Sequence, residues 1–491
     1  MKDGSRYEYE LSKYGQVSFT LPDASQGGSS SGGSGDPLPT EPTGVMDNQV
    51  YNEATFDNAN LQDKLLHETD ENGDLIDGAI GLPSTGTYNA LVIPVQFKND
   101  NITSEQLARL EKAFNGTSSD TGWESVKTFY QKSSYGKLNI TFDIQPVFQA
   151  SKTSSEYAQY TEKIDVQGQT WDKDGSALIL EEALAWCVGQ GVDLSKYDTN
   201  DDGCIDAVYL IYSESVDYDN ADFFWAYVTW YYGDTQFGGK DAYYYLFAGF
   251  DFMDADPNTT LPDGVIINTE TYVHETGHLL GLDDYYDYDD SKGSNQGLGG
   301  ADMMDYNVGD HGVYSKIMLG WLTPEIVTST KTVTIQSSQA GGYAILIPLN
   351  WNNSYFCEYL LIDLYTADGL NAMGASQQNT ILYGGAKYGV RIYHVSSSIN
   401  NPYNDEYGSF TDNNNSYSNI PLIKLVEADG NDSIANGDYA SQNDLWQAGD
   451  TFSSVYSEYM RNDGKTLNFD ISIESVSATE ATVTVTYNTA A

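Results

Sequence analysis

Apolar residues in the first half of the chain occur in patterns that are typical of alternating strands and helices. Residues 90–97 form a nearly continuous apolar run, which predicts a strand buried on both faces. A helix is expected next, over residues 104–114, with Ser104 as its N-cap. Further elements are expected downstream: a helix over residues 125–133, a turn at 135–137, a strand over 138–144, a helix over 175–189 and a strand over 205–213.

This order of elements predicts the class of the first large domain. Strands alternate with helices, and a further helix is expected near Tyr272. Such an order indicates an α/β or α+β domain, which we expect to end near Pro324 and to cover residues 86–325. After Pro324 the pattern changes to short segments of alternating apolar and polar residues, typical of strands in an all-β domain over residues 326–491. These segments are residues 331–336, 343–348, 359–364, 388–395, 421–427, 468–476 and 481–487.

The first 85 residues differ from the rest in composition and in the pattern of apolar residues. Residues 1–22 contain two strand-like pieces, 7–11 and 16–21, which cannot build a core alone and are expected to be the tail of a preceding module or a propeptide. Residues 23–45 are rich in Gly and Ser and then in Pro, which predicts a flexible linker. Residues 46–85 are polar with little periodicity and are expected to form an N-terminal extension.

Length and charge narrow the class of protein. The chain has 491 residues, more than one ordinary core fills. It carries 23 basic and 71 acidic residues, so its formal net charge is 23 − 71 = −48. A surface of that charge repels nucleic acid and anionic membranes and attracts divalent cations. Because no stretch of about 18 apolar residues is present, no membrane insertion is expected.

The cysteines indicate which kind of metal site is expected, and the N-terminal residues indicate where the protein is located. Cys187, Cys204 and Cys357 form no Cys-x-x-Cys pair, which argues against a cysteine-ligated zinc site, and each is expected to be a small buried thiol. Residues 1–9 are polar and charged, unlike a signal peptide. The acidic composition, rich in Tyr, Asn, Ser and Gly, favours a secreted or cell-surface protein whose signal peptide has been removed; a cytosolic protein is the alternative.

The clearest chemical motif is His-Glu-Thr-Gly-His-Leu-Leu-Gly-Leu-Asp-Asp at residues 274–284. On a helix, His274 and His278 project from one face one turn apart, so both imidazoles can reach one zinc ion. Glu275 is expected beside that metal as the general base that takes a proton from the attacking water. Gly281 can end the helix and return the chain, which then offers a third ligand. The alternative is a buried helix with two hydrogen-bonded histidines.

A second motif follows a Gly-rich loop that ends at residues 299–300. The sequence Met303-Met304-Asp305-Tyr306-Asn307 fits the methionine-containing turn, or Met-turn, that lies beneath the zinc site in metzincins, and Met304 is the expected residue. The alternative is a pair of core methionines.

Together these motifs resemble the immune inhibitor A-type family of secreted bacterial zinc metallopeptidases, over roughly residues 88–455. The matching stretches are residues 274–284, 302–307 and 319–324, with 125–138, 391–395 and 427–430 as further matches. The resemblance implies an α+β zincin, metzincin-like catalytic domain followed by an all-β domain. It also implies zinc, endopeptidase activity on proteins, secretion and often calcium. Trp225-Ala226-Tyr227 lacks the histidine of the family's Trp-x-His step, so that role does not carry over.

The third zinc ligand is expected to be Asp284. Asp283 and Asp284 both follow Gly281, and in an extended return neighbouring side chains point to opposite sides, so only one of them can face the metal. The resemblance places the family's ligand three residues after the glycine, which is Asp284.

Oxygen ligands with calcium-loop spacing occur at Asp198, Asn200, Asp202 and Asp206, with Gly203 at the sixth position. The twelfth position is Tyr209, so no full EF-hand is present, and the alternative is an acidic turn before a strand. A second acidic run, residues 287, 289 and 290, and a weaker set, residues 429, 432 and 438, are further calcium candidates.

The predicted function is zinc-dependent hydrolysis of peptide bonds in extracellular protein or peptide substrates. Tyr306, His311 and Tyr314 are candidates for stabilising the oxyanion, although each could be structural. Two alternatives remain. One is a non-catalytic, calcium-stabilised surface-binding protein on the same scaffold, which has no need of Glu275. The other is a peptidase restricted to glycoproteins. The natural substrate and the oligomeric state are not predicted.

Overall fold

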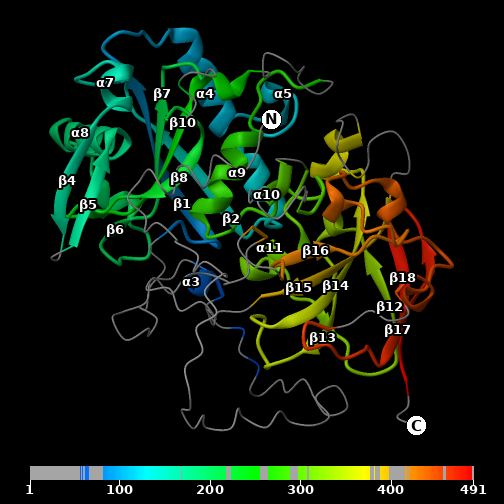
Figure 1. The fold of residues 1–491 in the computed structure, drawn as a ribbon. Helices are drawn as coiled ribbons and strands as arrows, with labels where there is room; N and C mark the ends of the chain where they lie inside the picture. Colours follow the sequence, from blue (N-terminus) through cyan, green and yellow to red (C-terminus); the bar gives the residue numbers. More distant parts are fainter. Residues whose placement is uncertain are drawn as a thin grey trace, which may run out of the picture.

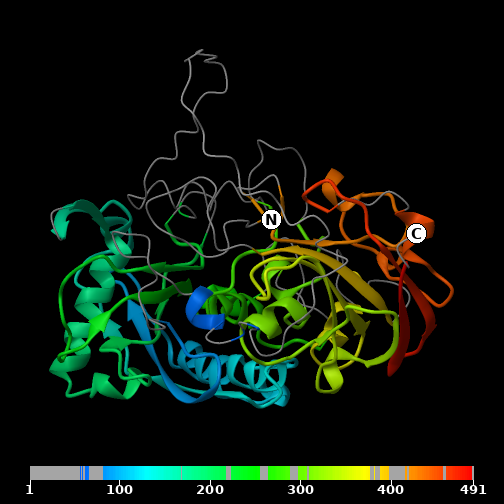
Figure 2. The ribbon, with the colours of Figure 1, turned by 90° about the horizontal axis from the view of Figure 1, so that it is seen from below.

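The protein is described by a computed structural model that places most of the chain from residue 81 onward. The described residues are 56, 58, 61–65, 81–166, 169–216, 220, 223–254, 264–287, 297–306, 309–375, 381, 388–397, 415–416, 420–456 and 461–488. The expected N-terminal module (1–22) and linker (23–45) lie outside these residues, as do the two strand-like pieces expected within the module. The chain is a mixed α/β protein with a second, strand-rich region (Figures 1 and 2).

The first large sheet has six strands, in the order β2-β1-β7-β10-β8, with β3 beside β1. Neighbouring strands run parallel, except that β8 runs antiparallel to β10 at the edge of the sheet. Alternate residues of β1 enter two separate apolar clusters, so the sheet is buried on both faces, as the apolar run predicts. The strands are β1 (Gly86–Gln96), β2 (Leu138–Ile144), β3 (Phe148–Gln149), β7 (Val208–Tyr212), β8 (Tyr227–Trp230) and β10 (Tyr244–Gly249).

Helices cover both faces of this sheet (Figure 1). Three of them, α4 (Ser104–Asn115), α6 (Val126–Ser133) and α9 (Glu270–Leu279), contribute apolar residues to the cluster that contains Ala90 and Val92. Helix α8 (Gly175–Gly189) packs in the other cluster, with Leu91 and Ile93 of β1. The sheet is thus the middle layer of three, and α9 lies on the same side as α4 and α6.

The second region holds two antiparallel-rich sheets, in the orders β11-β13-β14-β15-β16 and β12-β18-β17. Except for the two-residue strand β11, its strands fall on the segments expected after Pro324, with ends that differ by a few residues. They are β11 (Glu325–Ile326), β12 (Lys331–Gln336), β13 (Ile345–Asn350), β14 (Glu358–Thr366), β15 (Tyr388–Ser396), β16 (Ile423–Leu425), β17 (Phe469–Val476) and β18 (Glu480–Tyr487).

Shorter elements complete the described chain. Two of them, strands β4 and β5, form an antiparallel hairpin that the sequence pattern does not predict. The others lie in connections between the larger elements. They are α3 (Leu61–Leu65), α5 (Ser118–Thr121), α7 (Ser154–Ala158), β4 (Thr161–Val166), β5 (Gln169–Asp174), β6 (Cys204–Ile205), β9 (Asp241–Ala242), α10 (Met303–Tyr306), α11 (Val313–Met318) and α12 (Phe452–Val455).

Two expectations about element ends are wrong. The N-cap of α4 is Thr103, whose hydroxyl accepts from the Gln106 amide while the Gln106 side chain accepts from the Thr103 amide, so Ser104 is already helical. The strand expected over 205–213 is two strands, β6 and β7. The chain leaves the ladder between them because the Asp206 amide donates to the Tyr197 carbonyl at 2.7 Å.

The two regions share contacts across the expected boundary at residue 325. One apolar cluster contains Leu346 and Tyr393 together with residues of α4, α6 and α9. Arg391 of β15 forms a buried ion pair with Asp363 and donates to the carbonyl of Ala301 at 2.9 Å. The second region therefore holds the loop that precedes α10, whereas the division into domains at 325 stays a prediction.

Among the described residues, no helix combines the length and the apolar character that a membrane span requires.

Candidate metal centre

Helix α9 carries the two motif histidines and ends beside them. Gly281 takes a φ of 93°, in the left-handed region that glycine adopts without strain. The Leu282 amide donates back to the Gly277 carbonyl at 3.0 Å, which closes the helix end. The chain therefore turns back toward His274 and His278, as the sequence predicts.

Three side-chain atoms meet at this helix end. His274 Nε2 lies 2.9 Å from Asp284 Oδ1 and 3.1 Å from His278 Nε2, and His278 Nε2 lies 3.3 Å from Asp284 Oδ1. Ligand atoms around a tetrahedral zinc ion, with bonds of about 2.0–2.1 Å, lie roughly 3.3 Å apart. Two imidazoles and one carboxylate are also a donor set of catalytic zinc sites. The residues present therefore fit a zinc ion after small outward shifts.

Asp284, rather than Asp283, faces the imidazoles. The side chain of Asp284 is 3% exposed and lies against both histidines. Asp283 is partly exposed and does not belong to any group of three close metal-ligating side chains among the described residues. The alternation of side chains after Gly281 thus places Asp284 where the third ligand is expected, and its binding of metal stays a prediction.

Both imidazoles are oriented by backbone carbonyls. His274 Nδ1 lies 2.9 Å from the Met303 carbonyl oxygen, and His278 Nδ1 lies 2.7 Å from the Leu282 carbonyl oxygen. A carbonyl only accepts, so each Nδ1 carries the proton and donates it. In the neutral imidazole this leaves the Nε2 lone pair free for a metal, the usual outer-shell arrangement of histidine ligands.

Without a metal, the charges of His278 and Asp284 stabilise each other. Burial opposes the charge on His278, but Asp284 outweighs it and raises the pKa of His278 to about 10. Burial also works against the charge on Asp284, yet His278 and His274 hold the pKa of that carboxyl well below its ordinary value. The anionic carboxylate is thus kept available, and a cation that enters must displace a proton from the imidazoles.

Met304 lies beneath α9, where a Met-turn residue is expected. A Cβ atom at Gly277 would lie 2.5 Å from Met304 Sδ and 3.4 Å from His311 Cε1, so only glycine fits there without movement. The Met304 carbonyl also accepts from the Tyr285 amide at 2.8 Å, just after Asp284. The turn therefore touches both the helix and the returning segment that form the centre.

Glu275 is buried on the same helix, with 6% of the residue exposed. Burial raises the pKa of Glu275, against the opposing effect of His278 and His274, so the carboxyl interacts electrostatically with both imidazoles. It follows His274 on α9 and is not one of the three converging groups. Its role as the proton acceptor stays a prediction.

The three candidates for oxyanion stabilisation lie in different surroundings. His311 is buried against Tyr130, which it contacts through Nε2 at 3.3 Å, and burial lowers the pKa of His311 to about 3. Tyr314 is buried, and its hydroxyl bonds to Ser397 at 3.1 Å. Only Tyr306 is partly exposed. His311 and Tyr314 are thus buried and Tyr306 is partly exposed, and an oxyanion role for any of the three stays a prediction.

Sequence reasoning missed two tyrosines that pack against Tyr306, and one of them also contacts His274. The ring of Tyr286 stacks at 6.5 Å from His274 and lies 6.2 Å from Tyr306. Tyr439, from the second region, packs edge-on against Tyr306 at 5.1 Å. Tyr286 lies two residues after Asp284, which could have marked it, whereas nothing in the sequence connects Tyr439 with residues so distant.

The expected calcium loop is closed by its own hydrogen bonds. Asp198 accepts from the Gly203 amide at 3.2 Å and pairs with Lys240, and Asp206 accepts from the Thr199 amide at 3.0 Å. Burial, assisted by Asp202 and Asp198, raises the pKa of Asp206 to about 7.

The positions of the four expected calcium ligands support an ion only in part. Asn200 Nδ2 donates to Asp202 Oδ2 at 2.8 Å, whereas Oδ1 of Asp198 and of Asp206 are buried without a hydrogen-bond partner. Within the described residues, no three acidic side chains of this loop converge within 4.8 Å. Calcium at this loop stays a prediction.

The structure describes the other two acidic sets, which were further calcium candidates, to different extents. Residues 289 and 290 lie outside the described residues, so the set that begins at Asp287 is not placed. In the third set, Asp432 pairs with Lys424 at 2.5 Å, and Asp429 instead converges with two other carboxylates, Glu427 and Asp444. His394, on β15, is buried with Nε2 2.9 Å from Glu358 Oε1.

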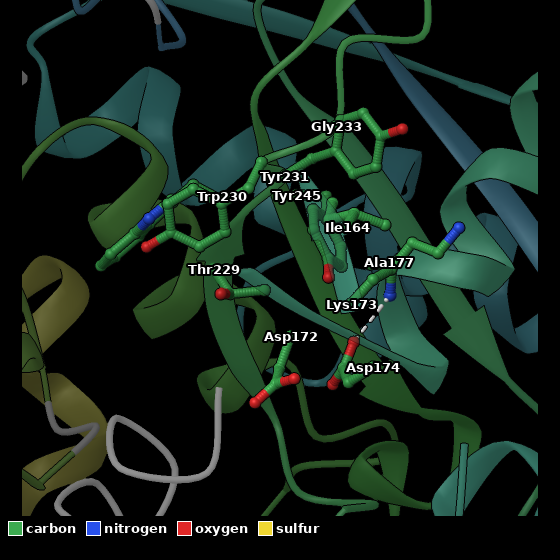
Figure 3. A pocket seen from close by; sticks show the side chains of 11 residues that line it. Ile164, Asp172, Lys173, Asp174, Ala177, Thr229, Trp230, Tyr231, Gly233 and Tyr245 are labelled. Atoms are coloured by element: carbon green, nitrogen blue, oxygen red, sulfur yellow. Dashed lines mark hydrogen bonds between the residues drawn. The ribbon is translucent and has the colours of Figure 1, made fainter. Parts of the chain in front are cut away.

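A pocket lies between the β4–β5 hairpin, α8 and β8 (Figure 3). Aromatic and charged side chains face it, but none of its residues has a predicted metal or catalytic role. They are Ile164, Asp172, Lys173, Asp174, Ala177, Thr229, Trp230, Tyr231, Tyr232, Gly233 and Tyr245.

Comparison with protein-family models and with curated proteins found no match for this chain. The functional reading therefore depends on the residues and their geometry.

Proposed function

We propose that this protein is a zinc-dependent endopeptidase with a zincin-type centre. The observation that carries the proposal is the convergence of His274 Nε2, His278 Nε2 and Asp284 Oδ1, all within 3.3 Å of one another, with Glu275 buried beside them. Within that class, the order of motifs favours a secreted enzyme akin to the immune inhibitor A-type metallopeptidases.

The surroundings of α9 suit an extended peptide substrate. Strand β8 lies at the edge of the sheet, is antiparallel to its neighbour and contacts α9. Edge strands can bind an extended peptide as an additional strand, with main-chain hydrogen bonds. A substrate aligned along β8 would pass close to the helix that carries the histidines. This supports protein or peptide substrates in an extended conformation.

The chain's own residues would carry out the following chemistry. Bound zinc supplies a Lewis acid that polarises the scissile carbonyl and makes water more acidic. The Met303 and Leu282 carbonyls hold the two imidazoles so that their Nε2 atoms face the metal. Glu275 takes a proton from the attacking water and passes it to the leaving amine. Tyr306 is the side chain proposed to stabilise the oxyanion.

An extracellular location is part of the proposal. A net charge of −48 keeps the protein soluble and attracts divalent cations, which are abundant outside cells. Calcium is accordingly proposed as a second, structural cofactor.

Metal analysis with a proteolysis assay tests this function. The purified chain should contain one zinc ion and should digest casein. Removal of zinc by 1,10-phenanthroline should abolish the digestion, and added zinc should restore it. Mass spectrometry of the products would then give the cleavage preference. Digestion that persists in the metal-free protein, or a full zinc content with no cleavage of any protein in a mixed digest, would contradict the proposal.

A further inference from the structure

Three carboxylates converge in the second region, just after β16. One oxygen atom from each of Glu427, Asp429 and Asp444 lies within 4.8 Å of the other two. Glu427 and Asp444 are buried, at 0% and 1% exposure, whereas Asp429 is exposed. The group is thus set into the protein and reaches solvent through Asp429.

Glu427 receives only neutral hydrogen-bond donors. Its carboxylate accepts from the amides of Ser433 and Ile434 at 2.7 and 3.1 Å, and from the Ser433 hydroxyl at 2.8 Å. None of the three carboxylates pairs with a lysine or arginine anywhere in the described part of the chain. Lys424, on the adjacent strand, pairs with Asp432 instead. The negative charge of the group is therefore uncompensated by protein cations.

A second observation, on Asp444, also indicates that a bound cation would stabilise this group. Its Oδ2 accepts from the Ser441 amide at 2.6 Å, while its Oδ1 is buried and has no hydrogen-bond partner among the described residues. Burial, together with Glu427, raises the pKa of Asp444 to about 6. A buried carboxylate oxygen without a partner is costly, and a bound cation removes that cost.

We propose that Glu427, Asp429 and Asp444 bind a calcium ion, at a site separate from the zinc centre. The donors are oxygens only, with neither histidine nor cysteine, which favours a hard cation over zinc. Calcium accepts six to eight oxygen ligands in flexible geometry, so three carboxylates with water and main-chain oxygens suit it. The same buried carboxylates without an ion would have to hold a proton, which is the competing explanation.

The ion would join the two ends of the segment from residue 427 to residue 444. Within that segment, the Ala440 amide donates to the Gly299 carbonyl at 2.7 Å, and Tyr439 packs against Tyr306. Calcium would therefore steady a segment that contacts the loop before α10 and lies beside the zinc centre. Calcium binding itself does not depend on the proposed peptidase function, so the two can fail separately.

Calorimetric titration of the full chain with calcium chloride, in calcium-free buffer that contains zinc, tests the site. The variants are Asp429→Asn, which changes an exposed residue, and Asp444→Asn, which can keep the bond from Ser441. Asp432→Asn is the matched control, because Asp432 belongs to the same segment but pairs with Lys424. Asp202→Asn serves to report separately on the loop that contains Asp198. Circular dichroism and a cooperative thermal transition establish that each variant is folded.

The expected result is that wild type and Asp432→Asn bind one more calcium ion than Asp429→Asn and Asp444→Asn. At minimum, those two variants should lose affinity by about tenfold, since even outer-shell changes at metal sites cost roughly 10- to 100-fold. Asp444→Asn should also melt at a higher temperature than wild type in calcium-free buffer, because a buried negative charge is removed. Equal binding by all five proteins, or loss only in Asp202→Asn, would overturn the proposal. If Asp444→Asn does not fold, Asp429→Asn decides.

Discussion

The Nδ1 atom of His274 lies 2.9 Å from the carbonyl oxygen of Met303. The imidazole of a proposed metal ligand is thus oriented by the main chain of the turn beneath the helix. Because a carbonyl can only accept, His274 is held in the tautomer whose Nε2 faces Asp284. The turn and the ligand set are therefore one structural unit, and changes in either should alter metal binding.

Replacement of Glu275 by glutamine should separate metal binding from catalysis. The amide keeps the size of the buried side chain but cannot take a proton from water. We expect unchanged zinc content and a fall in turnover of about 10²- to 10⁴-fold, the usual contribution of a general base. The checks are atomic absorption and the initial rate of peptide cleavage. Activity within tenfold of wild type would remove Glu275 from the mechanism.

Asp284→Ala and Asp283→Ala form a matched pair at neighbouring positions. Asp284 contacts both imidazoles, whereas Asp283 lies outside the converging group. The first variant should purify with much less zinc and little activity, and the second should keep both. Zinc content after dialysis against a weak chelator measures the difference. Equal zinc in the two variants would refute the ligand assignment.

Gly277→Ala should show whether close packing against Met304 matters. The new methyl group would meet Sδ at 2.5 Å, so we expect a loss of about 1–3 kcal/mol from overpacking. Gly189→Ala, near the end of α8, is the control, because nothing lies within 4 Å of its added Cβ. It should be neutral or stabilising, by about 0.5–1 kcal/mol at most. Urea denaturation measures both.

A double variant tests the same contact from the other side. Met304→Ala removes the clashing atoms, so Gly277→Ala should cost less in that background than in wild type. Strictly additive effects would show that the two residues do not interact.

Asp198→Ala combined with Asp202→Ala tests the loop over residues 198–206. If the loop binds calcium, the ion should raise the melting temperature of wild type by mass action, and the double variant should lose the part of the rise that the loop provides. Scanning calorimetry with and without calcium is the measurement. A calcium response identical to that of wild type would identify the loop as an acidic turn held by Lys240.

His311 should make the fold sensitive to acid. Its pKa is lowered by burial to about 3, so between about pH 6.5 and pH 3 the unfolded chain binds a proton that the folded chain excludes. The contribution of His311 to the free energy of unfolding is therefore complete above pH 6.5. It falls as the pH drops, by at most about 1.4 kcal/mol per pH unit. Denaturation of metal-free protein at pH 7 and pH 5 should show a smaller acid loss in His311→Phe. Equal losses would contradict the assignment.

The sequence predicts elements well where one pattern dominates. The buried strand β1 and the helix α8 follow from apolar runs and helix-forming residues. The β4–β5 hairpin is missed because its strands, such as Thr161–Val166, carry many charged side chains and little apolar alternation. The break before β7 is missed because it depends on a hydrogen bond between Asp206 and the distant Tyr197 carbonyl.

For the site, side-chain spacing predicts which atoms converge, but not what orients them. His274, His278 and Asp284 follow from one helix turn and one glycine. The carbonyls of Met303 and Leu282 could belong to any residue type, so no sequence signal marks them. Likewise, Asp444 joins Glu427 only because the chain folds back, and acidic spacing along the sequence instead suggested Asp432.

The bond from Arg391 to the Ala301 carbonyl limits how the two regions can evolve separately. Arg391 belongs to the second region, yet it supports the loop that leads into the turn under the histidines. A fragment that ended at residue 325 would keep every proposed zinc ligand and lose this support. The two regions cannot then be exchanged or deleted as independent modules, and we expect them to be inherited together.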